Sequence, residues 1–438
     1  MKKIVLFSLI ALLHFACKEE EIAPQQSAVE TLDHTLATKW FDLQLKLTLQ
    51  SAGFVPPVVS RAFAYSSLAL YEGIQPGTSK YASILPMLNS APTYTIDPDI
   101  EYYWPAVGNA AVAEMVRFMF DNSPTTLLPE IDSLEQSFEE EYAKEVNNET
   151  LIRSIEKGKD LALLLYNWSL TDGGHRAYNR LFPSSYIPPI GTGLWTPTNS
   201  GRALLPYWGE NRPFIKGLLE LSASPGPPNY SEDPSSEFYS EANEVYEVSK
   251  NLTEEQKLIA YYWADDPLVT FTPPGHSVSI LGQLLEKEKA SLDFSAYAYL
   301  LLGIAQADIF IACWKSKYSS NLLRPITYIQ QHIDPLWNSY IVTPPFPEYT
   351  SGHSSQSGAS ARVFTHLFGE DYAFVDRTHD KLDLGFPNRS FSNFYEMAEE
   401  AGMSRIYGGI HFNSGNIHGR EQGFKVADAL LSLEIRNQ

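Results

Sequence analysis

The sequence predicts an all-α protein whose helices are separated by long irregular loops. Nine segments place apolar residues at three- and four-residue spacing over lengths typical of helices, whereas strand-like alternation is scarce. Hydrophobic residues make up 44% and charged residues 19% of the 438-residue chain, so it can bury a large core. We therefore expect helices packed into bundles, with one large unit or two fused units.

The predicted helices follow one another from about residue 57. They cover residues 57–74, 108–122, 131–145, 150–168, 236–250, 253–263, 276–290, 294–316 and 354–368. A capping box marks the start of one of them, because Thr253 precedes Gln256 by three residues. No internal repeat with a period of 20–50 residues is evident.

Proline, glycine and aromatic residues dominate the longest predicted loop, residues 183–234. A loop of that length in a compact protein is usually functional or lies on the surface, because a buried one would leave backbone polar groups without partners. We place a soft boundary near residue 230. It separates an N-terminal helical region, 36–230, from a helical catalytic region, 231–438.

The N-terminus has the layout of a bacterial lipoprotein signal. Two lysines, an apolar run and Ala16 precede Cys17 in MKKIVLFSLIALLHFAC, and the apolar run is shorter than the roughly 20 residues of a membrane span. We expect a signal peptide at 1–16, a tether at 17–35 and a lipid on Cys17. The protein would then be anchored in the cell envelope, at the outer membrane or surface of a Gram-negative bacterium. Since Cys313 is the only other cysteine, we expect no disulfide framework.

Charge excludes one large class of partner. The formal net charge is −20, and no run of Lys and Arg could follow a phosphate backbone, so we expect no nucleic acid to bind. An anion that binds this acidic chain must be held by a local cluster of positive groups.

Lys317 and Arg324 form the first candidate cluster, in KYSSNLLRP at 317–325. Their spacing is close to two helical turns, about 7.2 residues, so on a helix both cations would project from nearly one face before Pro325 disturbs it. The flanking segments are apolar, where an unpaired charge is costly. The pair therefore indicates an anion between the two cations, although a solvated charged face is the alternative.

The second candidate cluster is Ser351-Gly352-His353, at the end of the proline-rich stretch PPFPEYTSGH. A helix rich in Ser, Gly and Ala follows, and the free N–H groups at a helix start bind anions. The ordinary pKa of histidine, about 6.5, makes His353 a candidate acid or base at neutral pH. Taken alone, a histidine at a helix start is more often a cap or a surface residue.

Arg405 and His411 form the third candidate cluster, in SRIYGGIH. Ala398, Ala401 and Arg405 share one helix face, so the arginine should point inward and needs an anionic partner. A glycine pair at 408–409 would let the chain bend and return His411 to the same site. The alternative is a buried arginine paired with a carboxylate such as Asp265 or Asp266.

The three clusters together suit an oxyanion. They supply cations, a serine hydroxyl, an amide-rich helix start and two histidines, and carboxylates, which a divalent cation would need, are missing from them.

Read in this order, the clusters resemble the signature of vanadium-dependent haloperoxidases and type 2 phosphatidic acid phosphatases. The matching motifs are Lys317-x6-Arg324-Pro325, Ser351-Gly352-His353 and Ser404-Arg405-x5-His411. The upstream segments GLWTPT, LPYWGENRPF, WADDP and TPPGHSVSI also look like bacterial haloperoxidase-like proteins, so the resemblance extends from about residue 36. It implies an all-α fold of helical bundles with the oxyanion between them.

The resemblance also implies a role for each site residue. Vanadate or phosphate would be held by Lys317, Arg324, Ser351, Gly352 and Arg405. His411 would be the axial ligand of vanadium or, in a phosphatase, the phosphorylated nucleophile. His353 would be the acid or base that activates bound peroxide or protonates a leaving group.

Two positions depart from the pattern. Thr350 replaces the proline usual before Ser-Gly-His, which should alter loop stiffness more than chemistry. Gly415 stands where the phosphatase pattern expects an aspartate that orients the last histidine. Without that carboxylate His411 should be a poorer phosphoryl acceptor, whereas a vanadium ligand needs it less because a backbone carbonyl can orient the ring.

Three functional hypotheses follow. The first is a vanadate enzyme that oxidises a halide with hydrogen peroxide to hypohalous acid. The second is an acid phosphatase that hydrolyses a phosphomonoester at the same site. The third is a non-catalytic surface lipoprotein that binds a glycan or a protein partner through its aromatic loops.

Overall fold

The computed structural model describes residues 28–198 and 201–437. The predicted signal peptide and the lipidated Cys17 lie outside the described residues and stay predictions. A first helical turn, α1 (Ala28–Thr31), lies within the stretch predicted to be a tether, so regular structure begins before residue 36.

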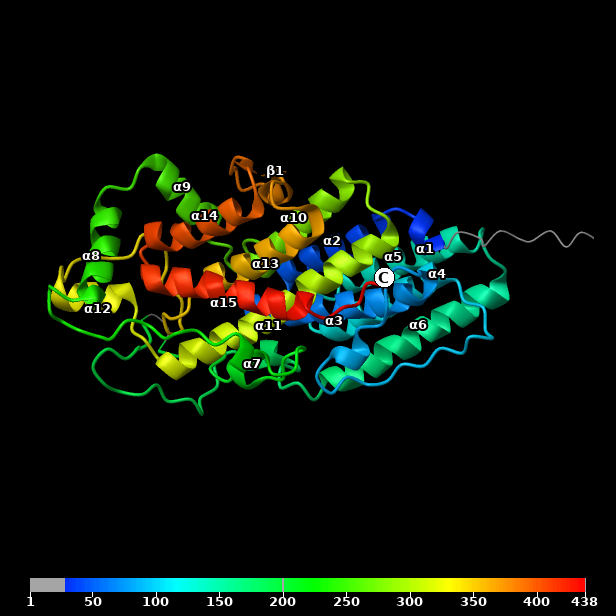
Figure 1. Ribbon diagram of the computed structural model, residues 1–438, viewed down its shortest axis with the longest axis horizontal. Helices are drawn as coiled ribbons and strands as arrows, with labels where there is room; N and C mark the ends of the chain where they lie inside the picture. Colours follow the sequence, from blue (N-terminus) through cyan, green and yellow to red (C-terminus); the bar gives the residue numbers. More distant parts are fainter. Residues whose placement is uncertain (1–27, 199–200, 438) are drawn as a thin grey trace, which may run out of the picture.

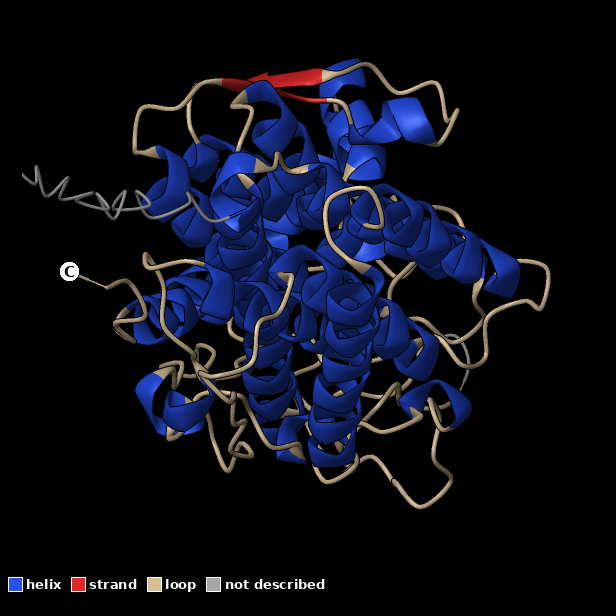
Figure 2. Ribbon diagram, turned by 90° about the vertical axis from the view of Figure 1, so that its right-hand side faces the viewer, coloured by secondary structure: helices blue, strands red, loops and turns tan. Residues whose placement is uncertain are grey.

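The described part of the chain is mainly α-helical, as the sequence predicts. The longer helices are α2 (Thr35–Gln50), α3 (Pro56–Ile74), α4 (Trp104–Met119), α5 (Leu128–Tyr142), α6 (Asn148–Ser169), α8 (Glu237–Lys250), α9 (Glu254–Tyr262), α10 (Thr272–Lys287), α11 (Leu292–Ser320), α12 (Pro325–His332), α13 (Gly352–Phe368), α14 (Phe394–Tyr407) and α15 (Asn413–Leu431). A short helix, α7 (Leu218–Leu221), and two strands, β1 (Phe374–Asp376) and β2 (Arg389–Phe391), complete the regular elements. The strands pair antiparallel at one edge of the molecule (Figure 2).

All nine predicted helices are confirmed, and their ends differ from the predicted ones by at most four residues. The capping box of Thr253 and Gln256 is also present. The sequence prediction missed α2, α12 and α15. The last of these contains three glycines, Gly415, Gly419 and Gly423, which lower helix propensity and hide the pattern.

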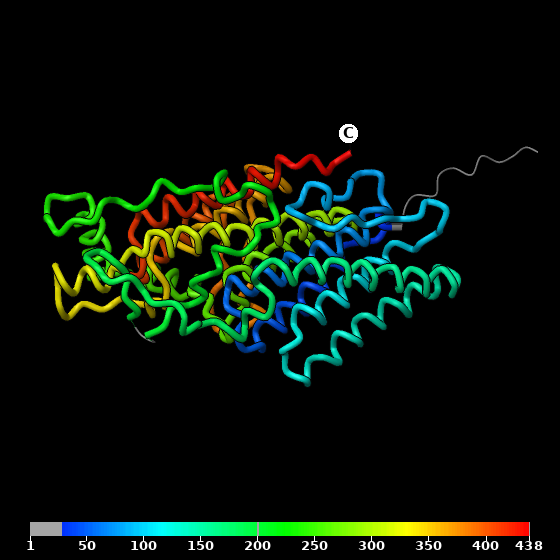
Figure 3. Tube along the Cα trace, turned by 90° about the horizontal axis from the view of Figure 1, so that it is seen from below, coloured from blue at the N-terminus to red at the C-terminus, as the bar shows by residue number. Residues whose placement is uncertain are grey.

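Helix α11 joins the two halves of the elongated molecule (Figure 1). It packs against α3 in the N-terminal half and against α13 and α15 in the C-terminal half. Of the described helices, α11 is the one with the length and apolar composition to cross a membrane, and its apolar window is wholly buried in the protein. It therefore serves as the core helix of the fold. In Figure 3 helices α5 and α6, in cyan and blue-green, lie toward the right-hand end and α12, in yellow, toward the left, with N-terminal and C-terminal helices side by side between them.

The long loop predicted at 183–234 runs over the end of α11 and the chain that follows it. Leu194 forms a β-bridge with Leu322, and the Leu204 N–H donates to the Pro345 carbonyl at 2.9 Å. The loop thus braces the two segments that carry Lys317 and the Ser-Gly-His motif.

Helices α13 and α15 pack closely because glycine lies at their contact. A Cβ atom at Gly423 would lie 2.2 Å from the Ser355 carbonyl oxygen, and one at Gly358 would lie 2.7 Å from that of Arg420. Gly352 and His353 begin α13, and His411 lies two residues before α15, so this contact fixes the separation of the two histidine-bearing segments.

A Gly423→Ala variant is expected to lose about 3 kcal/mol of unfolding free energy, because the added methyl group forces the helices apart. Chemical denaturation measures the effect. Gly282→Ala on α10 is the matched control: its Cβ would contact only the Tyr299 hydroxyl, at 3.3 Å, and alanine favours the helix. Equal stability of the two variants would contradict the close packing of α13 on α15.

Candidate active site

Lys317 and Arg324 do not lie on one helix, so that part of the prediction is wrong. Helix α11 ends at Ser320 because Asn321 takes the left-handed conformation, with φ of 45°. Arg324 is extended, with φ −84° and ψ 156°, and precedes α12. Both side chains are nevertheless fully buried and donate to carbonyls of the same loop, residues 346–348, and that they share one anion site stays a prediction.

Among the described residues, Lys317 bonds to backbone carbonyls and to no carboxylate. Its Nζ donates to the carbonyl oxygens of Pro347 at 3.1 Å and Glu348 at 2.9 Å. Burial lowers the pKa of the ammonium group to about 7. The Phe346 ring lies 4.9 Å from Nζ and also covers the guanidinium of Arg324 at 5.0 Å. An aromatic face therefore covers both cations.

Arg324 keeps part of its guanidinium free. Nε donates to the Phe346 carbonyl at 2.9 Å, and Nη1 donates to the Ile410 carbonyl at 2.7 Å and to His411 Nε2 at 3.1 Å. Its Nη2 is buried without a partner. Burial lowers the pKa of Arg324 to about 10.

Arg405 points inward, as the helix-face argument predicts, and is 1% exposed. It donates to the Ser404 hydroxyl at 2.8 Å and to the Ala260 carbonyl at 3.1 Å. Burial lowers its pKa to about 10, against the opposing effect of the Asp265 and Asp266 carboxylates. Neither carboxylate lies within ion-pair distance of it among the described residues, so the alternative of a closed ion pair is wrong.

The start of α13 offers the hydrogen-bond donors that the sequence predicts there. Ser351 precedes the helix, and its Oγ accepts from the Ser354 N–H at 3.4 Å and the Ser354 hydroxyl at 3.2 Å. The Ser354 hydroxyl also donates to Asn416 Oδ1 at 3.0 Å, so its single hydrogen is shared between two oxygens and the Ser351 hydrogen can turn to Ser354 Oγ or to an anion. The Gly352 N–H is one of the first amides of α13, which have no carbonyl partner within the helix.

Thr350 is a hydrogen-bonding anchor in addition to its effect on loop stiffness. Its hydroxyl donates to Gln422 Oε1 on α15 at 2.9 Å, and the side chain is fully buried. A proline there would leave Gln422 without this donor. The threonine thus ties the Ser-Gly-His loop to α15.

His353 is a neutral histidine with one free nitrogen. It bonds to the Trp263 backbone carbonyl, and its Nε2 is buried without a partner. Burial and the neighbouring Arg405 hold its pKa well below the usual range. Because a carbonyl only accepts, Nδ1 carries the proton and Nε2 is an acceptor.

His411 is also a neutral imidazole with its proton on Nδ1. This tautomer is fixed by a carboxylate that the sequence analysis missed. Its Nδ1 lies 2.7 Å from Glu348 Oε1, while its Nε2 accepts from Arg324 at 3.1 Å. Burial, together with Arg324 and Lys317, holds the pKa of His411 well below the usual range. The imidazole is therefore neutral, with the proton on Nδ1. The sequence feature that could have identified Glu348 is an acidic residue within an apolar, proline-rich stretch.

The expectation that His411 lacks an orienting carboxylate is therefore wrong. Gly415 leaves the space that Glu348 occupies, because a Cβ at 415 would lie 2.4 Å from Glu348 Oε1. Oε1 also accepts from the Phe412 N–H at 3.1 Å. The carboxylate comes from 63 residues earlier in the chain rather than from four residues later.

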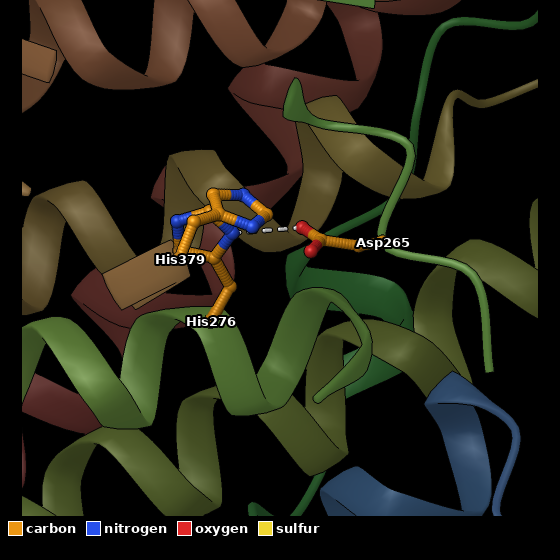
Figure 4. Close-up of side chains that lie close together, drawn as sticks. All are labelled: Asp265, His276 and His379. Atoms are coloured by element: carbon orange, nitrogen blue, oxygen red, sulfur yellow. Dashed lines mark hydrogen bonds and ion pairs between the residues drawn. The ribbon is translucent and has the colours of Figure 1, made fainter. Parts of the chain in front are cut away.

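A second buried histidine cluster includes Asp265, whose carboxylate acts electrostatically on His353. Asp265, His276 and His379 offer ligand atoms that lie within 4.8 Å of one another (Figure 4). However, both ring nitrogens of His276 meet carboxylates, Asp265 at 2.9 Å and Asp376 at 2.7 Å. Although burial disfavours its charge, these carboxylates raise the pKa of His276 to about 10.

A protonated imidazole has no lone pair for a cation, so we interpret this cluster as an ion-paired network. It fixes the segment that carries the Trp263 carbonyl: His379 Nε2 bonds to the Tyr262 carbonyl at 3.0 Å, and the Tyr262 hydroxyl donates to Asp376 at 2.7 Å. That carbonyl sets the tautomer of His353.

Comparisons with known proteins agree with this geometry. A family model described as the VCPO second helical-bundle domain matches residues 297–436, which include the three motifs. The crystal structure of a bacterial vanadium-dependent iodoperoxidase is similar with a TM-score of 0.80 and 31% identity, over 93% of this chain and 98% of that chain. The chain therefore belongs to the vanadium haloperoxidase family, and it is an enzyme homologue.

Two further relatives are more distant. Vanadium chloroperoxidase from Curvularia inaequalis is 28% identical over 210 residues, and the match spans 34% of this chain and about a third, 34%, of that protein's length. A bacterial vanadium-dependent chloroperoxidase in its holo form has a TM-score of 0.63 at 15% identity, over 88% of this chain and 94% of that chain. The similarity to this bacterial chloroperoxidase structure supports the assigned fold.

The site residues fit vanadate. Lys317, Arg324 and Arg405 are buried without a carboxylate within 4.0 Å among the described residues, and Arg324 Nη2 has no hydrogen-bond acceptor. Unpaired buried cations are costly, and an oxyanion relieves that cost. His353 Nε2 has no partner among the described residues and His411 Nε2 accepts from Arg324 alone, so the two imidazoles complete a set of groups that suits an oxyanion and its central atom.

Proposed function

We propose that this protein is a vanadate-dependent haloperoxidase that oxidises a halide with hydrogen peroxide to hypohalous acid. The observation that carries the proposal is that three buried cations, Lys317, Arg324 and Arg405, act electrostatically on His411, whose neutral imidazole has an acceptor lone pair at Nε2. Membership of the vanadium haloperoxidase family supports it. That membership also argues against the non-catalytic alternative.

In the proposed reaction one halide, one hydrogen peroxide and one proton give one hypohalous acid and one water. Vanadate, when bound, supplies the Lewis-acid centre at which peroxide is activated. Lys317, Arg324 and Arg405 balance the negative charge of the oxyanion, with the Ser351 hydroxyl and the Gly352 amide as further donors. His411 Nε2 is the protein ligand, and His353 Nε2 accepts and returns the proton that the reaction moves.

Halogenation by the reconstituted protein tests the proposal. The protein with orthovanadate is expected to iodinate or brominate a phenol dye when peroxide and halide are added, and the vanadate-free protein is not. Phosphate should compete with vanadate, because the same cage binds both anions. Turnover without vanadate, or none with it, would rule out this function.

A phosphatase is the second candidate, and Glu348 favours it. A carboxylate on His411 Nδ1 is the arrangement that makes a histidine a competent nucleophile, so the absence of an acid at 415 no longer argues against phosphoryl transfer. Phosphomonoester hydrolysis by the vanadate-free protein, inhibited by vanadate, is the result that would establish this activity instead.

A further inference from the structure

We propose that Glu348 positions the imidazole of His411, and that Gly415 leaves the space that the Glu348 carboxylate needs. The carboxylate fixes the proton of His411 on Nδ1, so that Nε2 faces the oxyanion as a lone-pair donor. The inference rests on the proposed function, since it gives His411 a bond to the central atom. Its test, however, measures binding rather than turnover.

Geometry supports the first half of the inference. Glu348 is 0% exposed, and its Oε1 accepts both from His411 Nδ1 at 2.7 Å and from the Phe412 N–H at 3.1 Å. The second bond fixes the carboxylate against the backbone next to His411. The ring is thus held from one side by Glu348 and from the other by Arg324, which donates to Nε2 at 3.1 Å.

These two contacts assign the tautomer. An arginine N–H only donates, so Nε2 must accept, and the remaining proton must lie on Nδ1 toward the carboxylate. A carboxylate behind a ligating imidazole also raises the electron density at the distal nitrogen and strengthens its bond to an electrophilic centre. Glu348 therefore acts on the strength of the bond as well as on the direction of the ring.

The limited space around Gly415 supports the second half of the inference. A Cβ at Gly415 would lie 2.4 Å from Glu348 Oε1 and 3.0 Å from Cδ, so a side chain at 415 and the observed position of Glu348 exclude one another. Position 415 lies in the first turn of α15, and a Cβ there would point at the same carboxylate oxygen that His411 Nδ1 meets. The two positions are therefore alternative sources for one carboxylate.

The test compares vanadate with phosphate binding in Glu348→Gln. Glutamine keeps the size and an acceptor oxygen but removes the charge. We expect vanadate affinity to fall 10- to 100-fold, the range for the loss of a group that supports a metal ligand. Phosphate affinity, which depends on the cage and not on a bond to His411, should change less than threefold. Calorimetric titration of both anions measures the two constants.

Glu241→Gln is the matched control. Glu241 also binds the start of α15, through the Ser414 N–H at 3.2 Å and hydroxyl at 2.7 Å, but has no contact with His411. It should leave both affinities unchanged. The double variant Glu348→Ala with Gly415→Asp should recover at least tenfold of the vanadate affinity that Glu348→Ala loses.

Nitrogen-15 NMR of the histidines gives an independent readout: His411 should have its proton on Nδ1 in the wild type. Equal loss of vanadate and phosphate affinity in Glu348→Gln, or a proton on Nε2 in the wild type, would overturn the inference. A wild type that binds vanadate through Glu348-supported His411 but fails to halogenate would instead contradict the proposed function alone.

Discussion

Replacing His411 by alanine is expected to reduce vanadate-dependent halogenation by about 10³-fold or more, as the loss of a catalytic group does. In the proposed site its Nε2 is the protein atom that bonds to the oxyanion's centre, in place of the hydrogen bond that it accepts from Arg324 in the anion-free protein, and Glu348 holds the ring from the other side. The cationic cage remains in the variant. It should therefore still bind phosphate, which a thermal-shift titration detects.

His366→Ala is the matched control for this variant. His366 lies in the last turn of α13, where it bonds to the Tyr297 hydroxyl at 3.2 Å, far along the helix from the Ser-Gly-His motif. It should keep full activity. If His411→Ala halogenated at a rate within tenfold of the wild type, His411 would not be the ligand.

Replacing Lys317 by methionine is expected to weaken phosphate binding about 100-fold at pH 6, because a charge-assisted hydrogen bond is lost. The effect depends on pH. Without an anion, burial lowers the pKa of Lys317 to about 7, and a bound anion raises it. Binding is therefore strongest below pH 7 and weakens as pH rises above 7 toward the raised pKa, by up to about tenfold per pH unit.

Calorimetric titration between pH 6 and 9 measures this dependence. Phosphate itself titrates in this range, but it does so equally for both proteins, so the ratio of the two affinities isolates Lys317. The ratio of wild-type to Lys317→Met phosphate affinity should decrease as pH rises. Lys315→Met is the control: Lys315 is exposed on the same helix and should reproduce the wild-type curve. A ratio independent of pH would show that Lys317 stays charged without an anion.

Sequence periodicity predicted most of the helices because their apolar stripes face a large core. It missed α15, where Gly419 and Gly423 serve the close contact with α13 instead of helix propensity. The same kind of local reasoning placed Lys317 and Arg324 on one helix. The actual break at Asn321 depends on a left-handed residue that the pattern of charges does not report.

The site residues were predicted from motif order; the structure buries Lys317, Arg324 and Arg405 and brings them into electrostatic contact with His411, and their roles stay predictions. Glu348 was missed because its partner lies far along the chain: the carboxylate was sought four residues after His411, and its supply from the Ser-Gly-His loop depends on tertiary structure. The glycine at 415 was read as a loss, whereas it makes room for that carboxylate. A departure from a local pattern can thus mark a compensating residue elsewhere.

A crystal structure of the protein soaked with orthovanadate tests the central claim most directly. We predict electron density for one oxyanion between Lys317, Arg324 and Arg405, with vanadium bonded to His411 Nε2 and Glu348 on the opposite nitrogen of the ring. Density in the cage without a bond to His411, or vanadate bound elsewhere on the molecule, would contradict the account.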